Sequence, residues 1–175
     1  GYTTNITDQS GNVIETLKDS DSNRVYKTYE EITANSEYLP HAFVAIEDER
    51  FYEHNGVDLQ GIIRAGIVGI TNGFNFTESA STLTQQLIKN NVFTDWVNES
   101  TLQRFQRKFQ EWYLALELEK QVDKDEILEN YLNTINLGNG NYGVQAAAQD
   151  YFGKDVSELT LSECTVLAGI TQNPT

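Results

Sequence analysis

The feature that most constrains this fold is a helical repeat of large apolar side chains in the middle of the chain. Between residues 102 and 120, the repeat places Phe105, Phe109, Trp112 and Leu116 at i, i+4, i+7 and i+11. This spacing puts the four side chains on one face of an α-helix. It predicts an amphipathic helix whose apolar stripe packs into a core.

Helix signals recur along most of the remaining chain. Apolar residues follow an approximate 3.6-residue period over residues 40–54, which predicts a helix there. Capping-box patterns predict further helix starts near Thr82, Asp123 and Thr160. Only residues 1–37 differ, since they open with two short extended runs around a Gly-containing turn. We therefore predict a mainly α-helical domain with a short β-hairpin-like N-terminal segment leading into it.

The chain is acidic, but its cations are gathered in one place. It has 12 Lys and Arg against 26 Asp and Glu, a net charge of −14. Such a surface repels phosphate backbones, which excludes a general nucleic-acid binder. Much of the positive charge falls in one short stretch, which predicts a specific anion site: Lys89, Arg104, Arg107, Lys108 and Lys120.

The chain also carries signs of being part of a longer protein. It starts at Gly1 and contains no Met, so we expect a fragment. It has no apolar run of about 18 residues, so no membrane span is predicted within it.

Residues 57–77 combine apolar side chains with four glycines. Each glycine costs a helix about 1 kcal/mol relative to alanine. The segment is therefore predicted to be an irregular, mobile lobe. Two roles are open for it, namely an irregular core segment, or a flap that touches lipid or closes over a substrate.

An acidic cluster occupies the end of the helix predicted over residues 40–54, with Glu47, Asp48, Glu49, Glu53 and His54. On a helix, Glu47 and His54 would share a face with the apolar Phe51. Partial desolvation of a carboxylate suits general acid or base chemistry. The alternative is a solvated acidic helix face. A zinc site is a weaker alternative because the HExxH spacing is absent.

Polar side chains crowd the helix start in SASTLTQQLIKN, residues 79–90. Ser81, Gln85 and Lys89 lie at i, i+4 and i+8, with Gln86 beside them. A helix N-terminus favours anions through its free amides and its dipole. The row therefore predicts a site for sugar or phosphate oxygens, and the alternative is an ordinary capped helix with a polar exposed face.

The stretch RFQRKFQEW supplies three cations and one carboxylate, namely Arg104, Arg107, Lys108 and Glu111. They form i, i+4 pairs opposite the predicted aromatic stripe. One interpretation is surface salt bridges worth a few tenths of a kcal/mol each. The other is a cradle for a pyrophosphate, with the carboxylate as its orienting group.

Taken in order, these segments resemble the motifs of the peptidoglycan glycosyltransferase domain of class A penicillin-binding proteins, glycosyltransferase family 51. The motifs are EDERFYEHNGVD, SASTLTQQLIKN, RKFQE, KDEILENYLN, and GNGNYGVQAAAQDYFGK followed by ELTLSECTVLAGI. The resemblance covers residues 38–175. It implies a lysozyme-like helical domain in which residues 57–77 form a small jaw lobe next to the membrane.

The resemblance also implies an activity and its setting. Domains of this family polymerise lipid II into β-1,4-linked glycan strands, with inversion at the anomeric carbon and release of undecaprenyl pyrophosphate. The expected partners are lipid II, the growing glycan strand and the membrane surface, with no nucleic acid. A membrane anchor and a transpeptidase domain are expected in the full-length protein, at the extracytoplasmic face of a bacterial membrane. No cofactor is fixed by the resemblance, although a divalent cation, Mg or Mn, would suit the donor pyrophosphate.

Site residues follow from positions in the motifs. Glu47 corresponds to the general base, and Glu111 to a second acidic residue that organises the donor pyrophosphate. The positions expected to bind substrate or to hold Glu47 in place are Asp48, Phe51, His54, Ser81, Gln85, Gln86, Lys89, Arg104, Arg107, Lys108, Glu126 and Tyr151. Gln103 and Gln110 stand where the family usually carries basic residues.

Two other classes of function remain open from the sequence. A lysozyme-like glycan hydrolase would use similar carboxylates with water as the acceptor, but it needs no pyrophosphate cradle, so the cation cluster argues against it. A non-catalytic cell-wall binding module is the second alternative. The presence of both Glu47 and Glu111 argues against that one.

Overall fold

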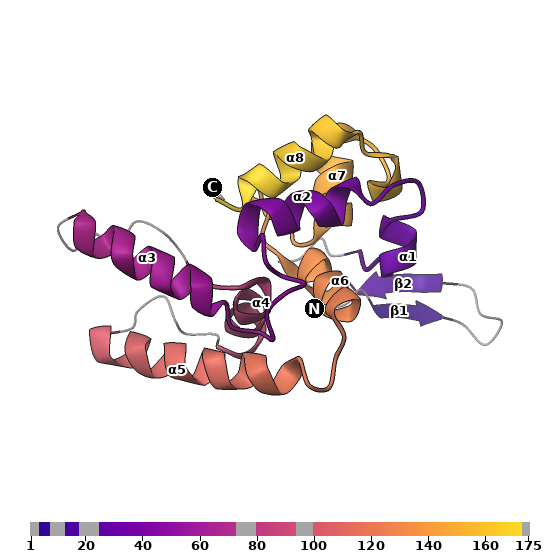
Figure 1. Cartoon of the computed structure of the whole chain (residues 1–175). Helices are drawn as coiled ribbons and strands as arrows, with labels where there is room; N and C mark the ends of the chain where they lie inside the picture. The colour runs from indigo at the N-terminus through magenta and orange to yellow at the C-terminus, as the bar shows by residue number, and fades with distance from the viewer. Residues whose placement is uncertain (1–3, 8–12, 18–24, 73–79, 94–99, 173–175) are drawn as a thin grey trace. The chain divides into compact units, whose positions relative to one another are not determined.

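The computed structural model describes residues 4–7, 13–17, 25–72, 80–93 and 100–172. Within these ranges the chain forms eight α-helices, one short 3-10 helix and two paired strands (Figure 1). The mainly α-helical class is therefore confirmed. The chain divides into two compact units, residues 1–43 with 128–175, and residues 44–127.

The first unit contains the strands and the C-terminal helices. Strands β1 (Thr4–Thr7) and β2 (Val13–Leu17) pair antiparallel. The helical elements that lie wholly or mostly here are α1 (Tyr29–Ile32), α2 (Tyr38–Glu47), α6 (Lys124–Thr134), α7 (Val144–Phe152), the 3-10 helix η2 (Val156–Glu158) and α8 (Leu161–Ile170). Helix α7 packs against α8 and η2. The predicted cap at Thr160 is confirmed by a reciprocal capping box with Glu163 at the start of α8.

The second unit contains α3 (Leu59–Thr71), α4 (Leu83–Val92) and α5 (Thr101–Leu118). Helix α4 packs against α5. The predicted helix start at Thr82 is confirmed, because the Thr82 hydroxyl accepts a hydrogen bond from the Gln85 amide at 3.2 Å. The Gln85 side chain does not complete a capping box. It donates instead to the carbonyl oxygen of Gly56 at 3.1 Å.

The structure corrects the helix predicted over residues 40–54. Helix α2 ends at Glu47, and residues 48–58, which we call the 48–58 loop, form turns. The loop begins with a turn, in which the amide of Phe51 donates to the carbonyl oxygen of Asp48 at 2.8 Å. Glu47 and His54 therefore do not share a helix face as the spacing predicted. They are linked instead through Asp48, which follows Glu47 and bonds to the His54 ring.

Residues 59–71 form helix α3, so the prediction of an irregular segment is wrong there. Asp58 caps this helix by accepting a hydrogen bond from the Gly61 amide at 3.0 Å. A Cβ at Gly61 would lie 2.5 Å from the Asp58 carboxylate, so this glycine lets the cap approach. The cap offsets part of the helix-weakening effect of glycine. Residues 73–77 lie outside the described residues, and the mobility of the lobe stays a prediction.

Helix α5 is present as predicted, but the face that it buries is not the predicted one. Phe105 and Phe109 are 62% and 64% exposed, whereas Arg107 and Glu111 are 7% and 0% exposed. The prediction of a buried apolar stripe is therefore wrong. Periodicity shows which residues share a helix face, but it does not show which face the rest of the protein covers. Here the buried face is the one that carries the ion-paired residues.

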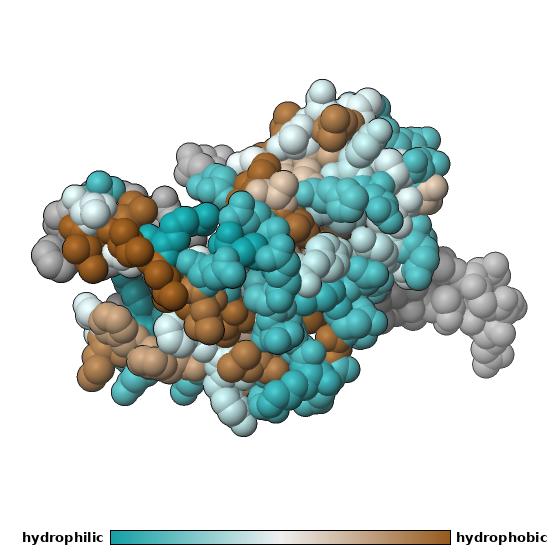
Figure 2. Space-filling model, in the orientation of Figure 1, coloured by the Kyte–Doolittle hydropathy of each residue, from teal (hydrophilic) through white to brown (hydrophobic). Residues whose placement is uncertain are grey.

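Two rows of apolar side chains are exposed on the second unit. We call them the apolar rows. The row on α5 consists of Leu102, Phe105, Phe109, Tyr113 and Leu116, and the row on α3 consists of Leu59, Ile63, Ile67 and Ile70. Figure 2 shows apolar surface gathered over these two helices. Contiguous apolar surface of this kind marks a protein or membrane contact. Among the described helices, none combines the length and apolar character needed to cross a bilayer.

Candidate active site

Glu47 stands at the C-terminal end of α2 and contacts α4. Its Oε2 accepts a hydrogen bond from Gln86 Nε2 at 2.9 Å. Glu47 and Gln86 are both half-buried. The structure thus brings together two predicted site residues that lie 39 positions apart in the sequence. The amide orients the carboxylate without adding a charge to it.

The neighbouring residue, Asp48, is buried and fixed from two directions. One carboxylate oxygen accepts from the Leu83 amide, in the first turn of α4, at 2.9 Å. His54 Nε2 lies 2.9 Å and 3.0 Å from the two carboxylate oxygens. Because the Gly56 amide donates to His54 Nδ1 at 3.1 Å, the ring proton belongs on Nε2 and points at Asp48. Asp48, the residue directly after Glu47, therefore links the end of α2 to the start of α4.

Gly56 ties the 48–58 loop to both α4 and α5. Its carbonyl oxygen accepts from the Thr82 hydroxyl at 2.8 Å and from Gln85 Nε2 at 3.1 Å. Its φ of +97° favours glycine, and a Cβ here would lie 2.6 Å from the Ala115 carbonyl oxygen on α5. Gln85 is only 1% exposed. Its side chain holds the loop in place, which is a structural role that the predicted row of donors did not include.

The cations gather around Glu111 on the buried face of α5. Arg107 pairs with Glu111 Oε1, and Lys108 Nζ lies 2.8 Å from Glu111 Oε2. Lys108 Nζ also donates to the Ser81 hydroxyl at 2.7 Å. Burial, and then the nearby charge of Lys108, hold the pKa of Lys89 below its ordinary value. Three cations and one carboxylate leave a positive site, as an anionic ligand requires.

A cavity of about 170 Å³ lies beside Glu47. Glu47, Asp48 and Ser81 all line it. Because Lys108 holds the Ser81 hydroxyl, this cavity has a carboxylate on one wall and a residue bonded to the cation cluster on another. Such an arrangement can accept a proton at Glu47 and stabilise negative charge close by.

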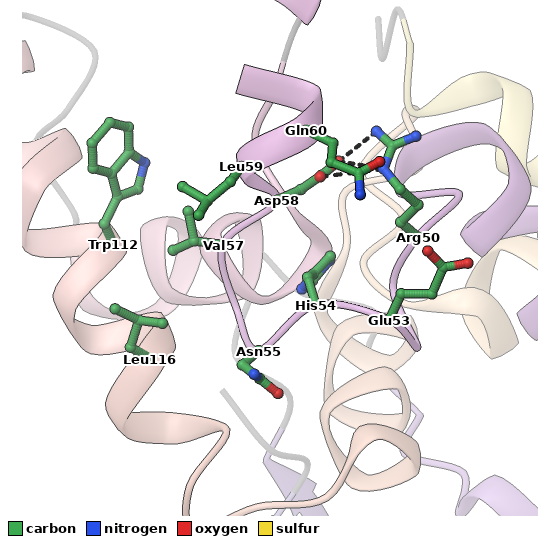
Figure 3. A pocket seen from close by; sticks show the side chains of 10 residues that line it. All are labelled: Arg50, Glu53, His54, Asn55, Val57, Asp58, Leu59, Gln60, Trp112 and Leu116. Atoms are coloured by element: carbon green, nitrogen blue, oxygen red, sulfur yellow. Dashed lines mark hydrogen bonds and ion pairs between the residues drawn. The ribbon is translucent and has the colours of Figure 1, made fainter. Parts of the chain in front are cut away.

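Arg50 and Asp58 line both this cavity and a larger one of about 480 Å³. Arg50 Nη2 lies 2.6 Å from Asp58 Oδ2, and this hydrogen bond holds the pKa of Asp58 below its ordinary value. Figure 3 shows the pair joined by dashed lines, with Trp112 and Leu116 of α5 at the other end of the larger cavity. The complete lining consists of Arg50, Glu53, His54, Asn55, Val57, Asp58, Leu59, Gln60, Trp112 and Leu116.

The four remaining predicted residues are Phe51, Arg104, Glu126 and Tyr151. Phe51 is fully buried and meets the His54 ring edge-on, with centroids 6.2 Å apart, so it supports the 48–58 loop. Arg104 is exposed near the start of α5, and Glu126 is exposed in the first turn of α6. Tyr151 belongs to α7 of the first unit, where its hydroxyl donates to the Leu137 carbonyl oxygen at 2.8 Å. Substrate binding by Arg104, Glu126 and Tyr151 stays a prediction.

Sequence reasoning missed several residues that build the site. The Arg50–Asp58 pair closes across the 48–58 loop, where neither a helix nor a strand period applies. Gly56 could have been found, since a glycine after a predicted helix signals a turn. Thr82 was recognised as a cap, but its second bond, to the Gly56 carbonyl oxygen, joins segments 26 positions apart.

The chain is similar to known proteins over most of its length. The transglycosylase family matches residues 10–175. Penicillin-binding protein 1A of Clostridium perfringens is 51% identical over 171 residues, which is 96% of this chain and 24% of that protein. The corresponding protein of Clostridium tetani is 41% identical over 97% of this chain and 20% of its own length. That of Haemophilus influenzae is 50% identical over 76% of this chain and 15% of its own length.

The chain therefore belongs to the transglycosylase family. It spans about a quarter or less of the length of these relatives.

Proposed function

We propose that this chain polymerises lipid II, with Glu47 as the general base. Glu47 takes the proton from the 4-hydroxyl of the acceptor sugar as that oxygen attacks the anomeric carbon of the donor. The new bond forms on the face opposite the leaving pyrophosphate, so the anomeric centre inverts and the linkage is β-1,4. Gln86 holds the carboxylate in position through its 2.9 Å hydrogen bond.

The cation cluster receives the leaving group in this proposal. Undecaprenyl pyrophosphate gains negative charge as the glycosidic bond to it breaks. Lys89, Arg107 and Lys108 stabilise this charge, and Glu111 holds the two α5 cations in place. Ser81 adds a hydroxyl at the edge of the cluster.

The single observation that carries the proposal is the cavity shared by Glu47 and Ser81. The Glu47 carboxylate and the Ser81 hydroxyl both line this one space, which supports a proton acceptor acting beside a phosphate-binding group. A hydrolase acting on finished glycan has no anionic leaving group that would need Lys89, Arg107 and Lys108 together.

The apolar rows support a membrane-bound setting. We infer that α3 and α5 form the jaw of a lysozyme-like domain and rest in the outer surface of the cell membrane, where lipid II is found. Exposed Ile and Phe side chains favour the interfacial region of a bilayer. The relatives are several times longer than this chain, which supports an anchor and a transpeptidase domain in the full-length protein.

A divalent cation, Mg or Mn, would be another way to neutralise the pyrophosphate. The residues beside the proposed pyrophosphate position suit an anion better than a cation, because Glu111 is already paired with Arg107 and Lys108. Within the described residues, no group of three or more His, Cys, Asp or Glu is arranged to hold a metal ion. A protein-held metal does not fit here, and any such cation would bind through the pyrophosphate itself.

The test is incubation of the protein with labelled lipid II in detergent or vesicles, followed by gel separation of the products. The expected result is a ladder of glycan strands, and Glu47→Gln should remove the ladder while circular dichroism and thermal unfolding stay unchanged. A folded Glu47→Gln protein that polymerises at the unaltered rate would exclude Glu47 as the base. Release of short sugar fragments from mature wall, without a ladder, would favour the hydrolase, and no turnover of either substrate would favour a binding module.

A further inference from the structure

Lys124, the first residue of α6, makes three contacts with groups that support the site. Its Nζ lies 2.6 Å from Glu119 Oε2, at the end of α5, and donates to the His54 carbonyl oxygen at 2.7 Å. The same ammonium lies 4.4 Å from the centroid of the Phe51 ring, within the range of a cation–π interaction. Two of these three contacts are to the 48–58 loop. The lysine therefore fastens that loop to the end of α5.

Glu119 connects this lysine to α4. Its side chain is only 4% exposed, and its second oxygen accepts from the Thr84 hydroxyl at 2.5 Å. A buried carboxylate with both oxygens engaged is held in one position. Lys124, Glu119 and Thr84 therefore form a clamp, which we call the Lys124 clamp, between α6, α5 and α4.

The clamp reaches Glu47 through a continuous series of contacts. Lys124 holds the backbone of His54, and the His54 ring holds the carboxylate of Asp48, the residue directly after Glu47. On the other side, Thr84 lies two positions before Gln86, whose amide holds Glu47. A displacement of Lys124 would thus change the positions of both Asp48 and Gln86, the two residues that hold Glu47 in place.

We propose that Lys124 is a positioning residue for Glu47, and that the Lys124 clamp fixes the 48–58 loop against α4 in the geometry that proton transfer requires. The inference rests on the proposed role of Glu47 as the base. Lys124 itself need not touch the substrate, since its ammonium is already engaged by Glu119, His54 and Phe51. A displacement of about 1 Å in a catalytic group can reduce the rate on the order of a hundredfold. Because the Lys124 clamp positions Glu47 and does not bind the substrate, its loss lowers kcat and leaves the affinity for lipid II nearly unchanged.

The primary test is Lys124→Met in the otherwise unaltered protein, assayed by lipid II polymerisation. Methionine keeps an unbranched side chain over Phe51 but removes the ammonium. We expect kcat to fall about tenfold or more, with KM for lipid II changed by less than about threefold. The structure does not support the predicted place of Lys120 in the anion site, because its side chain is 65% exposed and pairs with Glu117 near the end of α5. Lys120→Met is therefore the matched control. That control should stay within about twofold of the unaltered kcat.

Chemical restoration separates the ammonium from a general effect of mutation. Lys124→Cys can be alkylated with 2-bromoethylamine, which restores an ammonium at nearly the length of lysine. Alkylation with iodoacetamide gives a neutral adduct at the same position. The natural Cys164 is buried, so it is protected in the folded protein, and the unaltered protein treated with each reagent is the control. The amine adduct should regain most of the lost kcat, and the neutral adduct should not.

If Lys124→Met does not fold, Glu119→Gln tests the same proposal. It removes the carboxylate charge while keeping a similar shape, and it should also lower kcat at nearly constant KM. Three results would overturn the proposal. They are a folded Lys124→Met or Glu119→Gln protein with unaltered kcat, a rise in KM alone, or equal recovery with the neutral and the amine adducts. Failure of the proposed function would look different, since the unaltered protein would then form no glycan ladder, or Glu47→Gln would still form one.

Discussion

The His54 imidazole donates from Nε2 to the buried carboxylate of Asp48, while its Nδ1 accepts from the amide of Gly56. Both side chains are almost completely enclosed, at 7% and 2% exposure. The ring therefore bridges the two ends of the 48–58 loop. The loop that follows Glu47 is thus held by contacts between its own residues as well as by its bonds to α4.

His54→Ala should destabilise the fold. The change leaves a buried Asp48 oxygen without its donor, and an unsatisfied buried group costs about 1–3 kcal/mol. Urea unfolding monitored by circular dichroism would measure the loss. Glu53→Ala, at an exposed position of the same loop, is the control and should change stability by no more than about 0.5 kcal/mol. A His54→Ala protein as stable as this control would show that the bridge does not hold the loop.

Two glycines of the second unit should respond in opposite directions to alanine. Gly56→Ala forces a Cβ to within 2.6 Å of the Ala115 carbonyl oxygen at a φ of +97°, so we expect a loss of several kcal/mol or no folded protein. Gly66 lies inside α3, where an added Cβ would meet nothing within 4 Å, so Gly66→Ala should add up to about 1 kcal/mol of stability. Thermal unfolding of the two variants side by side measures both effects. Equal shifts in the same direction would contradict the geometry at Gly56.

Local signals in the sequence predicted local structure well. The caps at Thr82 and Thr160 are contacts between residues three positions apart, so the sequence contains everything that they need. The helix over residues 101–118 was predicted for the same reason. The motifs likewise located Glu47, Gln86 and Glu111, because each motif is a short segment.

The buried face of α5 and the end of α2 were not predicted, because both depend on contacts between residues far apart in the sequence. The aromatic residues of α5 were predicted to be buried, but the buried face is the one on which Ala115 closely approaches Gly56. The end of α2 at Glu47 depends on a bond between Asp48 and the Leu83 amide, 35 positions away. Neither contact leaves a periodic signal in the chain.

Asp58 should make stability depend on pH in the acidic range. The hydrogen bond from Arg50 is the main cause that lowers the pKa of Asp58, and burial opposes it. A carboxyl whose folded pKa lies below its unfolded value stabilises the fold above the unfolded pKa, and this contribution is lost as the pH falls through the folded pKa. Asp58→Asn keeps a residue that can cap α3 but removes the ion pair.

We therefore expect the unaltered protein to exceed Asp58→Asn in stability at neutral pH, with the difference shrinking below the ordinary Asp pKa of 3.8. Urea unfolding between about pH 7 and pH 3 would measure it. Glu53→Gln, measured in the same way, is the control for the loss of one negative charge from the 48–58 loop. A difference that stays constant across this range would show that the Arg50–Asp58 pair does not stabilise the fold.

The apolar row on α3 should control binding to lipid vesicles. Ile63 and Ile67 are 63% and 58% exposed, so polar residues there should leave the fold intact. Burying an Ile side chain contributes about 1.5–3 kcal/mol, so Ile63→Gln with Ile67→Gln should weaken vesicle binding about tenfold or more. Co-sedimentation with vesicles containing anionic phospholipid measures this. Leu161→Gln with Val166→Gln, at exposed positions of α8, is the matched control, and equal losses in the two double variants would contradict a role specific to α3.

Lys108 should contribute to donor binding through two partners at once. Its ammonium bonds to Ser81 and pairs with Glu111, so Lys108→Met removes a cation from the pyrophosphate position and also releases the Ser81 hydroxyl. We expect KM for lipid II to rise about tenfold, because one charge-assisted hydrogen bond contributes about 1.5–3 kcal/mol. Ser81→Ala should cost less, and the double variant should be no worse than Lys108→Met, since the hydroxyl acts only when the lysine holds it. Steady-state polymerisation kinetics of the three variants test this, with Lys120→Met as the control for loss of a surface charge. Independent effects that multiply in the double variant would show that Ser81 and Lys108 bind the donor separately.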